Sequence, residues 1–354
     1  MRKNVLIVAL VLLVALVSCA EHEHAWNAGV VVKKSTCIAE GEKVYTCEGC
    51  GAEMSEILPV DYDNGHSFVD GVCTECKQEE ALITTAVARV GSTYYDTLDG
   101  LFEKEKGEII EVVLLDDAKI SIAPWNEESG NRYVIGSEET KKISISGNDK
   151  TISFDRTNSD WNNVITANEN TVLEISNASI VGVGHGSNTG TWNTHDIYFN
   201  CNVILKNVVS KTAIAVGMNA NFEKVSISDK DVPSDTYMLW VVANGQVVKL
   251  SDCEIDGKNS SEKLSNRAIA IKDQYVESPA SVTLSVKDTI ISSDKKAAIL
   301  VTSTEGANIE LENVDIEGTP DKVNAVWIDN GSNYGVKIKD KVIVKGGSAI
   351  IEGN

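Results

Sequence analysis

The sequence predicts an all-β chain whose short strands stack as the coils of a parallel β-helix along most of its 354 residues. Three observations predict this class. Apolar and polar residues alternate with a period of two over residues 126–354, which is typical of strands with one buried face. A strand phrase that closes on Asn or Asp recurs mostly every 25 to 30 residues. No pattern of helix length interrupts this range.

The first nineteen residues have the features of an export leader. Arg2 and Lys3 give a basic start, and residues 5–17 form an unbroken apolar run. A run of this length is typical of a signal peptide and short for a membrane span. It ends in Leu-Val-Ser followed by Cys19, which resembles the lipobox of bacterial lipoproteins. The resemblance implies cleavage before Cys19 and a lipid on its thiol. The alternative is an ordinary secretory leader with a chance cysteine.

The leader and the patterns after it predict four segments. They are a signal peptide at 1–18, a Cys/His module at 19–80, a first-coil and cap segment at 81–125, and the β-helix at 126–354. We expect an exported protein, held by its N-terminal lipid on the cell membrane or outer membrane and facing outside the cytoplasm. The formal net charge of −20 repels phosphate backbones and excludes nucleic acid as a partner.

The Cys/His module carries five cysteines within forty residues. Four of them form two Cys-x-x-Cys pairs separated by twenty-two residues, which resembles a zinc ribbon with a slightly long gap. Two thiolates at this spacing can face one ion, and Gly49 and Gly51 supply the tight turn. The candidate ligands are Cys47, Cys50, Cys73 and Cys76, with Cys37, His22, His24 and His66 as further candidates.

Two ligand arrangements stay open. In one, the four paired cysteines hold a single ion. In the other, one ion is held by His24, Cys37, Cys47 and Cys50, and part of a second site is formed by His66, Cys73 and Cys76. A disulfide framework is the alternative in an oxidising compartment. The odd number of cysteines and the interspersed histidines favour metal. Because no open coordination position is implied, we expect zinc in a structural role.

The same segment resembles a cysteine–histidine module that occurs as single or tandem copies in surface proteins of anaerobic gut and oral bacteria. The resemblance covers about sixty residues and implies no particular activity. Its elements here are His24-Ala-Trp26, Cys37, Tyr45-Thr-Cys47-Glu-Gly-Cys50-Gly51, Gly65-His66-Ser-Phe68 and Gly71-Val-Cys73-Thr-Glu-Cys76.

Residues 81–125 lead into the strand repeats. Residues 87–98 are followed by an amphipathic turn over 99–106 and an apolar strand over 107–116. A stacked array has an exposed apolar end and an unpaired strand edge, and both need a cover. The segment resembles the entry segment of many exported β-helix proteins, which implies a hairpin-like start and a short helix that covers the open end of the first coil.

The repeated phrase follows from there. Asn or Asp closes most copies, because these side chains bond their own backbone and tolerate left-handed conformations. The copies lie at 173–180, 203–207, 248–255, 309–316 and 336–340, with a slipped copy at 282–288 and a degenerate one at 222–227. A second strand set, fitting another face of the same coil, lies at 213–216, 240–242, 267–271, 297–301 and 325–328.

This pattern resembles the right-handed parallel β-helix of pectin-lyase-like proteins, which implies Val, Ile and Leu stacks in the bore. A β-sandwich or propeller is the alternative, but Asn-Gly and Asp-Gly hairpin turns are rare here. Cys201 and Cys253 sit near the same phrase in different coils. They form either a disulfide or two buried thiols that act as small apolar residues.

Several polar residues are candidates for chemistry or binding. A lyase of this fold uses calcium-binding carboxylates with a basic residue; Arg267, Lys272 and Asp273 share one strand here, although surface charge explains them too. The Gly-rich loop 182–198 is the most unusual stretch. His195 paired with Asp196 or Asp160 would suit acid–base chemistry. The candidate ligand-binding side chains are His185, Trp192 and Tyr198, with Trp161 one coil earlier.

Taken together, these features predict a lipid-anchored surface protein for binding or adhesion, which presents its β-helix to a polysaccharide or a surface protein. The alternative is a polysaccharide lyase, with calcium as cofactor, or a glycoside hydrolase of the cell envelope. The fold alone cannot decide between them, because pectin-lyase-like helices carry both kinds of function. A compact cluster of carboxylates and basic groups on one face would favour the enzyme.

Overall fold

The computed structural model describes residues 23–121, 132–155, 164–183, 197–228, 237–257, 268–273, 276, 278–293, 297–318, 324–329, 332–344 and 348–352. The chain divides into two compact units, Met1–Glu80 and Ala81–Asn354. Within the described ranges no helix is both long enough and apolar enough to cross a membrane. The leader and Cys19 lie outside these ranges.

The first unit is built from short antiparallel strands. β1 (Val30–Lys33), β2 (Gly41–Thr46) and β3 (Glu53–Leu58) form one sheet, and β4 (Phe68–Val69) pairs with β5 (Val72–Cys73). Among its described residues the buried apolar side chains are Cys37, Cys47 and Cys73. Large apolar residues of the sheet face solvent instead, as Val30 and Ile57 do. A unit with so little apolar core needs another source of stability.

The second unit begins with a short cap. After α2 (Glu80–Thr85), strands β6 (Ala88–Val90) and β7 (Thr93–Tyr95) form an antiparallel hairpin, and α3 (Leu98–Lys104) follows. Thr97 begins α3 by accepting the Gly100 N–H on its hydroxyl at 3.1 Å. Leu101 and Phe102 on α3 pack into the core of the unit. The hairpin and the short helix are those expected from the sequence.

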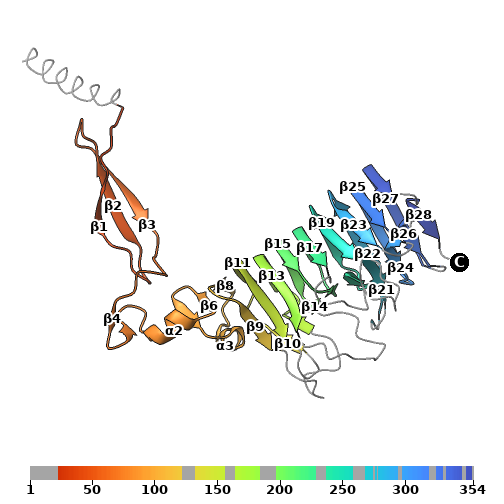
Figure 1. The fold of residues 1–354 in the computed structure, drawn as a ribbon, viewed down its shortest axis with the longest axis horizontal. Helices are drawn as coiled ribbons and strands as arrows, with labels where there is room; N and C mark the ends of the chain where they lie inside the picture. The colour runs from red at the N-terminus through yellow and green to blue at the C-terminus, as the bar shows by residue number, and fades with distance from the viewer. Residues whose placement is uncertain are drawn as a thin grey trace, which may run out of the picture. The chain divides into compact units, whose positions relative to one another are not determined.

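Two sheets of parallel strands follow the cap (Figure 1). After each visit to one sheet the chain crosses to the other and returns one strand further along. The nine-stranded sheet contains β10 (Arg132–Val134), β12 (Val164–Thr166), β14 (Ile197–Asn200), β16 (Ile214–Val216), β18 (Leu239–Val242), β21 (Ile269–Lys272), β24 (Ala297–Val301), β26 (Asn324–Ile328) and β28 (Ile350–Glu352).

The second sheet contains long strands that bend in the middle. On it β8 (Ile109–Leu114) and β9 (Ala118–Ser121) pair with the two halves of β11, and β6 lies antiparallel against the outer edge of β8. Its other strands are β11 (Lys142–Asp155), β13 (Val172–Val183), β15 (Asn202–Ser210), β17 (Ala220–Ser228), β19 (Val247–Ser251), β20 (Glu254–Gly257), β22 (Val282–Lys287), β23 (Ile290–Ser293), β25 (Ala307–Gly318) and β27 (Tyr334–Val344).

From β11 onward, each bend lies at a residue with positive φ. The residues that close the phrases in the sequence occupy these bends, so the prediction that Asn and Asp mark a turn is confirmed. Lys224 is the exception, in the degenerate phrase. The bend residues are Asn148, Asp149, Asn177, Asn207, Lys224, Asp252, Asp288, Asn313 and Asp340.

The core is made of equivalent positions from successive strands. Ile145, Ile175 and Leu205 are paired in register on β11, β13 and β15, and all three are buried. Parallel strands lie about 4.8 Å apart, so such columns fill the interior continuously. Cys201 and Cys253 belong to this core as free thiols, the second of the two alternatives. Burial raises the pKa of the Cys201 thiol to about 12.

Candidate metal centres

The candidate ligands of the first unit gather in two clusters. Within each cluster the ligand atoms lie within 4.8 Å of one another, so each could hold a metal ion. The two Cys-x-x-Cys pairs therefore serve different clusters rather than one four-cysteine site. Cys37 joins the second pair, not the first. The clusters are His24, Cys47 and Cys50 (the three-ligand cluster) and Cys37, His66, Cys73 and Cys76 (the four-ligand cluster).

The two Cys-x-x-Cys pairs adopt the same turn. In the first, the Cys47 N–H donates to the Ala52 carbonyl at 2.8 Å and the Gly51 N–H donates back to the Cys47 carbonyl at 2.8 Å. The second repeats this pattern from Cys73, with the equivalent bonds at 2.9 and 3.1 Å. The residue after each pair is left-handed, Gly51 at φ 73° and Lys77 at φ 66°. Gly49 thus lies within the predicted turn, and Gly51, directly after it, has the left-handed conformation.

Each turn is paired with a histidine segment in the same way. The residue after His24 accepts the Glu48 N–H at 2.9 Å, and the residue after His66 accepts the Thr74 N–H at 2.7 Å. Trp26 then lies opposite Cys47, as Phe68 lies opposite Cys73. Each histidine also stacks on the aromatic ring two residues later, at 5.0 Å for His24 and 5.7 Å for His66. The clusters are two copies of one local design.

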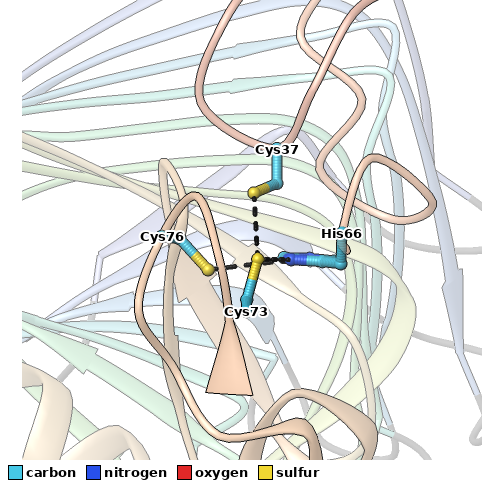
Figure 2. A group of neighbouring side chains, drawn as sticks. All are labelled: Cys37, His66, Cys73 and Cys76. Atoms are coloured by element: carbon cyan, nitrogen blue, oxygen red, sulfur yellow. Dashed lines mark hydrogen bonds between the residues drawn. The ribbon is translucent and has the colours of Figure 1, made fainter. Parts of the chain in front are cut away.

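The four-ligand cluster is compact (Figure 2). The Nδ1 atom of His66 lies 3.4 Å from Cys73 Sγ and 3.6 Å from Cys76 Sγ, and the Sγ atoms of Cys37 and Cys73 are 3.8 Å apart. The other ring nitrogen, Nε2, is 2.9 Å from the Tyr62 carbonyl. Because a carbonyl can only accept, Nε2 carries a proton, and Nδ1 faces the cysteine sulfurs, where its lone pair would be available to a bound metal ion.

Cys37 reaches the cluster because Gly65 lets two backbone segments touch. The Cys37 N–H donates to the Gly65 carbonyl at 3.1 Å. A Cβ on Gly65 would lie 2.5 Å from the Cys37 nitrogen and 2.4 Å from the Asp61 carbonyl oxygen. Such distances exclude any side chain there without a shift of backbone. The ligand set therefore depends on a contact between segments that are distant in sequence.

The thiols of the four-ligand cluster differ in acidity. Burial raises the pKa of Cys73, but hydrogen bonds from His66 and from backbone N–H groups outweigh it and bring the value to about 5. Burial, then the hydrogen bond with Cys73, raises the pKa of Cys37 to about 12. Without metal, Cys37 thus keeps its proton beside a thiolate at neutral pH. A bound cation would displace that proton.

The candidate residues of the second unit are brought together only in part. His185, Trp192, His195, Asp196, Asp160, Trp161 and Arg267 lie outside the described residues. Asp273 follows β21 and accepts the Thr304 N–H and hydroxyl at 3.0 and 2.9 Å, and these hydrogen bonds lower its pKa and link it to the turn between β24 and β25. Lys272 lies over the Tyr237 and Trp240 rings, at 5.3 and 5.5 Å.

Tyr198 points outward from β14, because Ile197 and Phe199 on either side of it are in the core. Sequence reasoning missed the row to which it belongs. Six residues with paired register lie along the outer face of the nine-stranded sheet: Tyr198, Ala215, Trp240, Ala270, Leu300 and Trp327. The middle four are buried, whereas the two end rings are partly exposed. The sequence signal that could have revealed this row is a tryptophan in two copies of the second strand set, Trp240 and Trp327.

No protein-family profile, curated protein or solved structure matches this chain. The function proposed below rests on the residues and geometry of the chain itself.

Proposed function

We propose that the chain is an exported lipoprotein in which a zinc-stapled module carries a right-handed parallel β-helix to the cell surface, where it binds a polysaccharide. The observation that carries the binding is the outer row of the nine-stranded sheet. Tyr198 and Trp327 are five strand steps apart, roughly 24 Å at about 4.8 Å per step. Partly exposed rings at both ends of an elongated face suit stacking against the apolar faces of sugars.

The β-helix is supported by the path of the chain. Successive strands of one sheet are parallel, and a strand of the other sheet lies between them in sequence. Connections between parallel strands of one sheet are right-handed in about 98% of cases, which assigns the hand. Bends at equivalent left-handed residues then divide each turn of the coil into three short faces. These features support the pectin-lyase-like fold that the sequence resembles.

Zinc is supported by the distances in the four-ligand cluster. Zinc bonds of about 2.3 Å to sulfur and about 2.05 Å to nitrogen, in tetrahedral geometry, place two sulfurs about 3.8 Å apart and nitrogen about 3.5 Å from sulfur. The corresponding distances here are 3.8 Å and 3.4 to 3.6 Å. Thiolate and imidazole donors also select zinc over calcium or magnesium. With four ligands and two fully buried sulfurs, this site would be structural.

The charged side chains of the described surface favour binding over catalysis. Lys142 and Lys206 both contact the Glu174 carboxylate, at 2.8 and 2.9 Å, and Lys287 contacts Glu312 at 2.7 Å. These ion pairs link neighbouring coils. Together with the hydrogen bonds between Asp273 and Thr304, they indicate that these charged side chains hold neighbouring strands together.

Affinity electrophoresis on plant, mucin and microbial polysaccharides tests the binding. Using the chain from residue 20 onward, we expect retardation by at least one polysaccharide and its loss in Tyr198→Ala or Trp327→Ala. Tyr334→Ala, which changes an exposed ring outside the row, is the matched control. Retardation that survives both row variants would overturn the proposed surface. New reducing ends or unsaturated uronates, with calcium present, would establish the lyase or hydrolase instead. No retardation on any polysaccharide would refute glycan binding and leave a protein partner.

Two further measurements test the module and the anchor. Metal analysis of the purified chain is expected to find zinc. The zinc content should fall in Cys73→Ser and stay unchanged in Cys201→Ser.

In bacteria that express the full chain, Cys19→Ala is expected to abolish labelling by a fatty-acid analogue and to release the protein from membranes. Labelling that persists in this variant would disprove lipidation at Cys19.

A further inference from the structure

The two metal clusters share one hairpin design but differ in how many ligands complete it. Cys37 supplies the fourth ligand to His66, Cys73 and Cys76. Among the described residues, the cluster of His24, Cys47 and Cys50 has three ligands. Because the backbone hydrogen bonds of the two hairpins are otherwise the same, the number of ligands is the main chemical difference between the two sites within the described part of the chain.

The residue before each histidine explains this difference. Gly65 precedes His66, and the absence of a side chain lets the Cys37 backbone pass at hydrogen-bonding distance. Glu23 precedes His24, so the equivalent close approach would meet a side chain. The first hairpin thus lacks the feature that recruits a donor from a distant segment.

The ligands of the three-ligand cluster are also more exposed to solvent than those of the four-ligand cluster. Cys37 and Cys73 are fully buried in the four-ligand cluster, with His66 and Cys76 half-buried. In the three-ligand cluster Cys47 is buried, but His24 and Cys50 are both exposed. A metal ion held by these three residues would therefore face solvent on its fourth side.

We propose that the three-ligand cluster holds a metal ion with an open coordination position, which accepts an imidazole or thiolate donor from outside the module. This inference rests on the metal binding proposed above. The two cysteine thiolates cancel the charge of a divalent ion. The site therefore has no net positive charge that would favour hard anions such as carboxylate or phosphate over imidazole or thiolate. Three protein ligands with one exchangeable position is also the composition of zinc sites that bind a water or substrate. The incoming donor displaces water, and a thiol releases its proton to solvent as it binds.

Cobalt(II) provides the test, because its visible spectrum reports each change of ligand. The chain from residue 20 onward, which retains every described residue and lacks the extra thiol of Cys19, is loaded with cobalt and titrated with 1-methylimidazole. We expect two cobalt ions per chain and a saturable spectral change from one of them. The response should be lost in Cys50→Ser, which keeps one cobalt ion, and retained in Cys76→Ser. A small thiol is the second probe, with retention of both ions checked by metal analysis.

The outcomes separate this inference from the metal binding on which it rests. A chain that binds no cobalt refutes the metal sites themselves. A chain that binds two ions and shows no response to either probe refutes the open position alone. His22 lies outside the described residues and provides a further check. If His22→Ala gains a response that the parent chain lacks, then His22 is the fourth ligand and the proposal is wrong.

Discussion

The side-chain amide of Asn207 donates a hydrogen bond of 2.8 Å to the side-chain oxygen of Asn177. Both residues are left-handed, with φ of 53° and 51°, at equivalent bends of β15 and β13. Asn313 and Asp288 repeat the relationship at 2.6 Å, beyond the bends at Lys224 and Asp252. At these four bends an Asn or Asp side chain therefore has two roles, since it tolerates the left-handed backbone and links its strand to a neighbouring strand.

Replacement of Asn177 separates these two contributions. Asn177→Ala should destabilise the second unit by about 1–2 kcal/mol, because it forces a Cβ-bearing residue without local hydrogen bonds into the left-handed region. Asn177→Gly loses the hydrogen bond but adopts positive φ freely, so it should cost less. Urea unfolding of both variants measures the difference. Equal losses of stability would show that backbone conformation is not what selects Asn at the bends.

The cap helix α3 should contribute to the stability of the second unit through its buried side chains, and not only by covering the end of the core. Leu101 is fully buried and packs with the first coils, so Leu101→Ala should cost about 2–5 kcal/mol. Glu103 on the same helix is exposed, and Glu103→Ala should change stability by less than about 0.5 kcal/mol. Thermal unfolding followed by circular dichroism compares them. Similar melting temperatures for the two variants would contradict a structural role for the helix.

The features predicted correctly from sequence are those that repeat locally. The bends were predicted because Asn and Asp close the phrases, and the cap because the open end of a stack of strands needs a cover. Lys224 shows the limit of this reasoning, since the stack imposes a left-handed bend on a residue that does not favour it. In the module the two Cys-x-x-Cys turns were predicted, but the grouping of Cys37 was not. That grouping depends on contact of Gly65 with Cys37, and no local pattern encodes such a contact.

The role of Gly65 is open to direct test. Gly65→Ala should push the Cys37 segment away and lower the affinity of the four-ligand cluster for metal, because the added Cβ would meet backbone atoms at 2.4 and 2.5 Å. Gly51→Asn is the control, since Gly51 has open space around it and Lys77 holds the equivalent left-handed position. Competition with a chelator measures zinc affinity. An unchanged affinity in Gly65→Ala would mean that Cys37 is dispensable.

Glu174 predicts how stability depends on pH. Hydrogen bonds from Lys142 and Lys206 lower the pKa of this carboxyl, although burial opposes them. A lowered pKa in the folded state stabilises the fold above the unfolded value of about 4.3, and this contribution disappears as pH falls through the folded pKa. Glu174→Gln should therefore cost roughly 0.5–1 kcal/mol at pH 7, a modest figure because both lysines are partly exposed. As pH falls through the folded pKa, the stability difference between the variant and the parent chain should shrink, and a constant difference during acid titration would contradict the assignment.

Cys201 and Cys253 should report global unfolding of the second unit. Both thiols are buried, and burial raises the pKa of each, so almost no reactive thiolate reaches solvent in the folded chain. After metal removal, an alkylating reagent should modify cysteines of the module within minutes and leave these two unmodified. In urea beyond the unfolding transition both should react. Mass spectrometry of proteolytic fragments identifies the modified residues, and Leu101→Ala should accelerate the slow reactions by raising the unfolded population. If Cys201 reacted as fast as the module cysteines under native conditions, the continuous core inferred from the paired strands would be wrong at that coil.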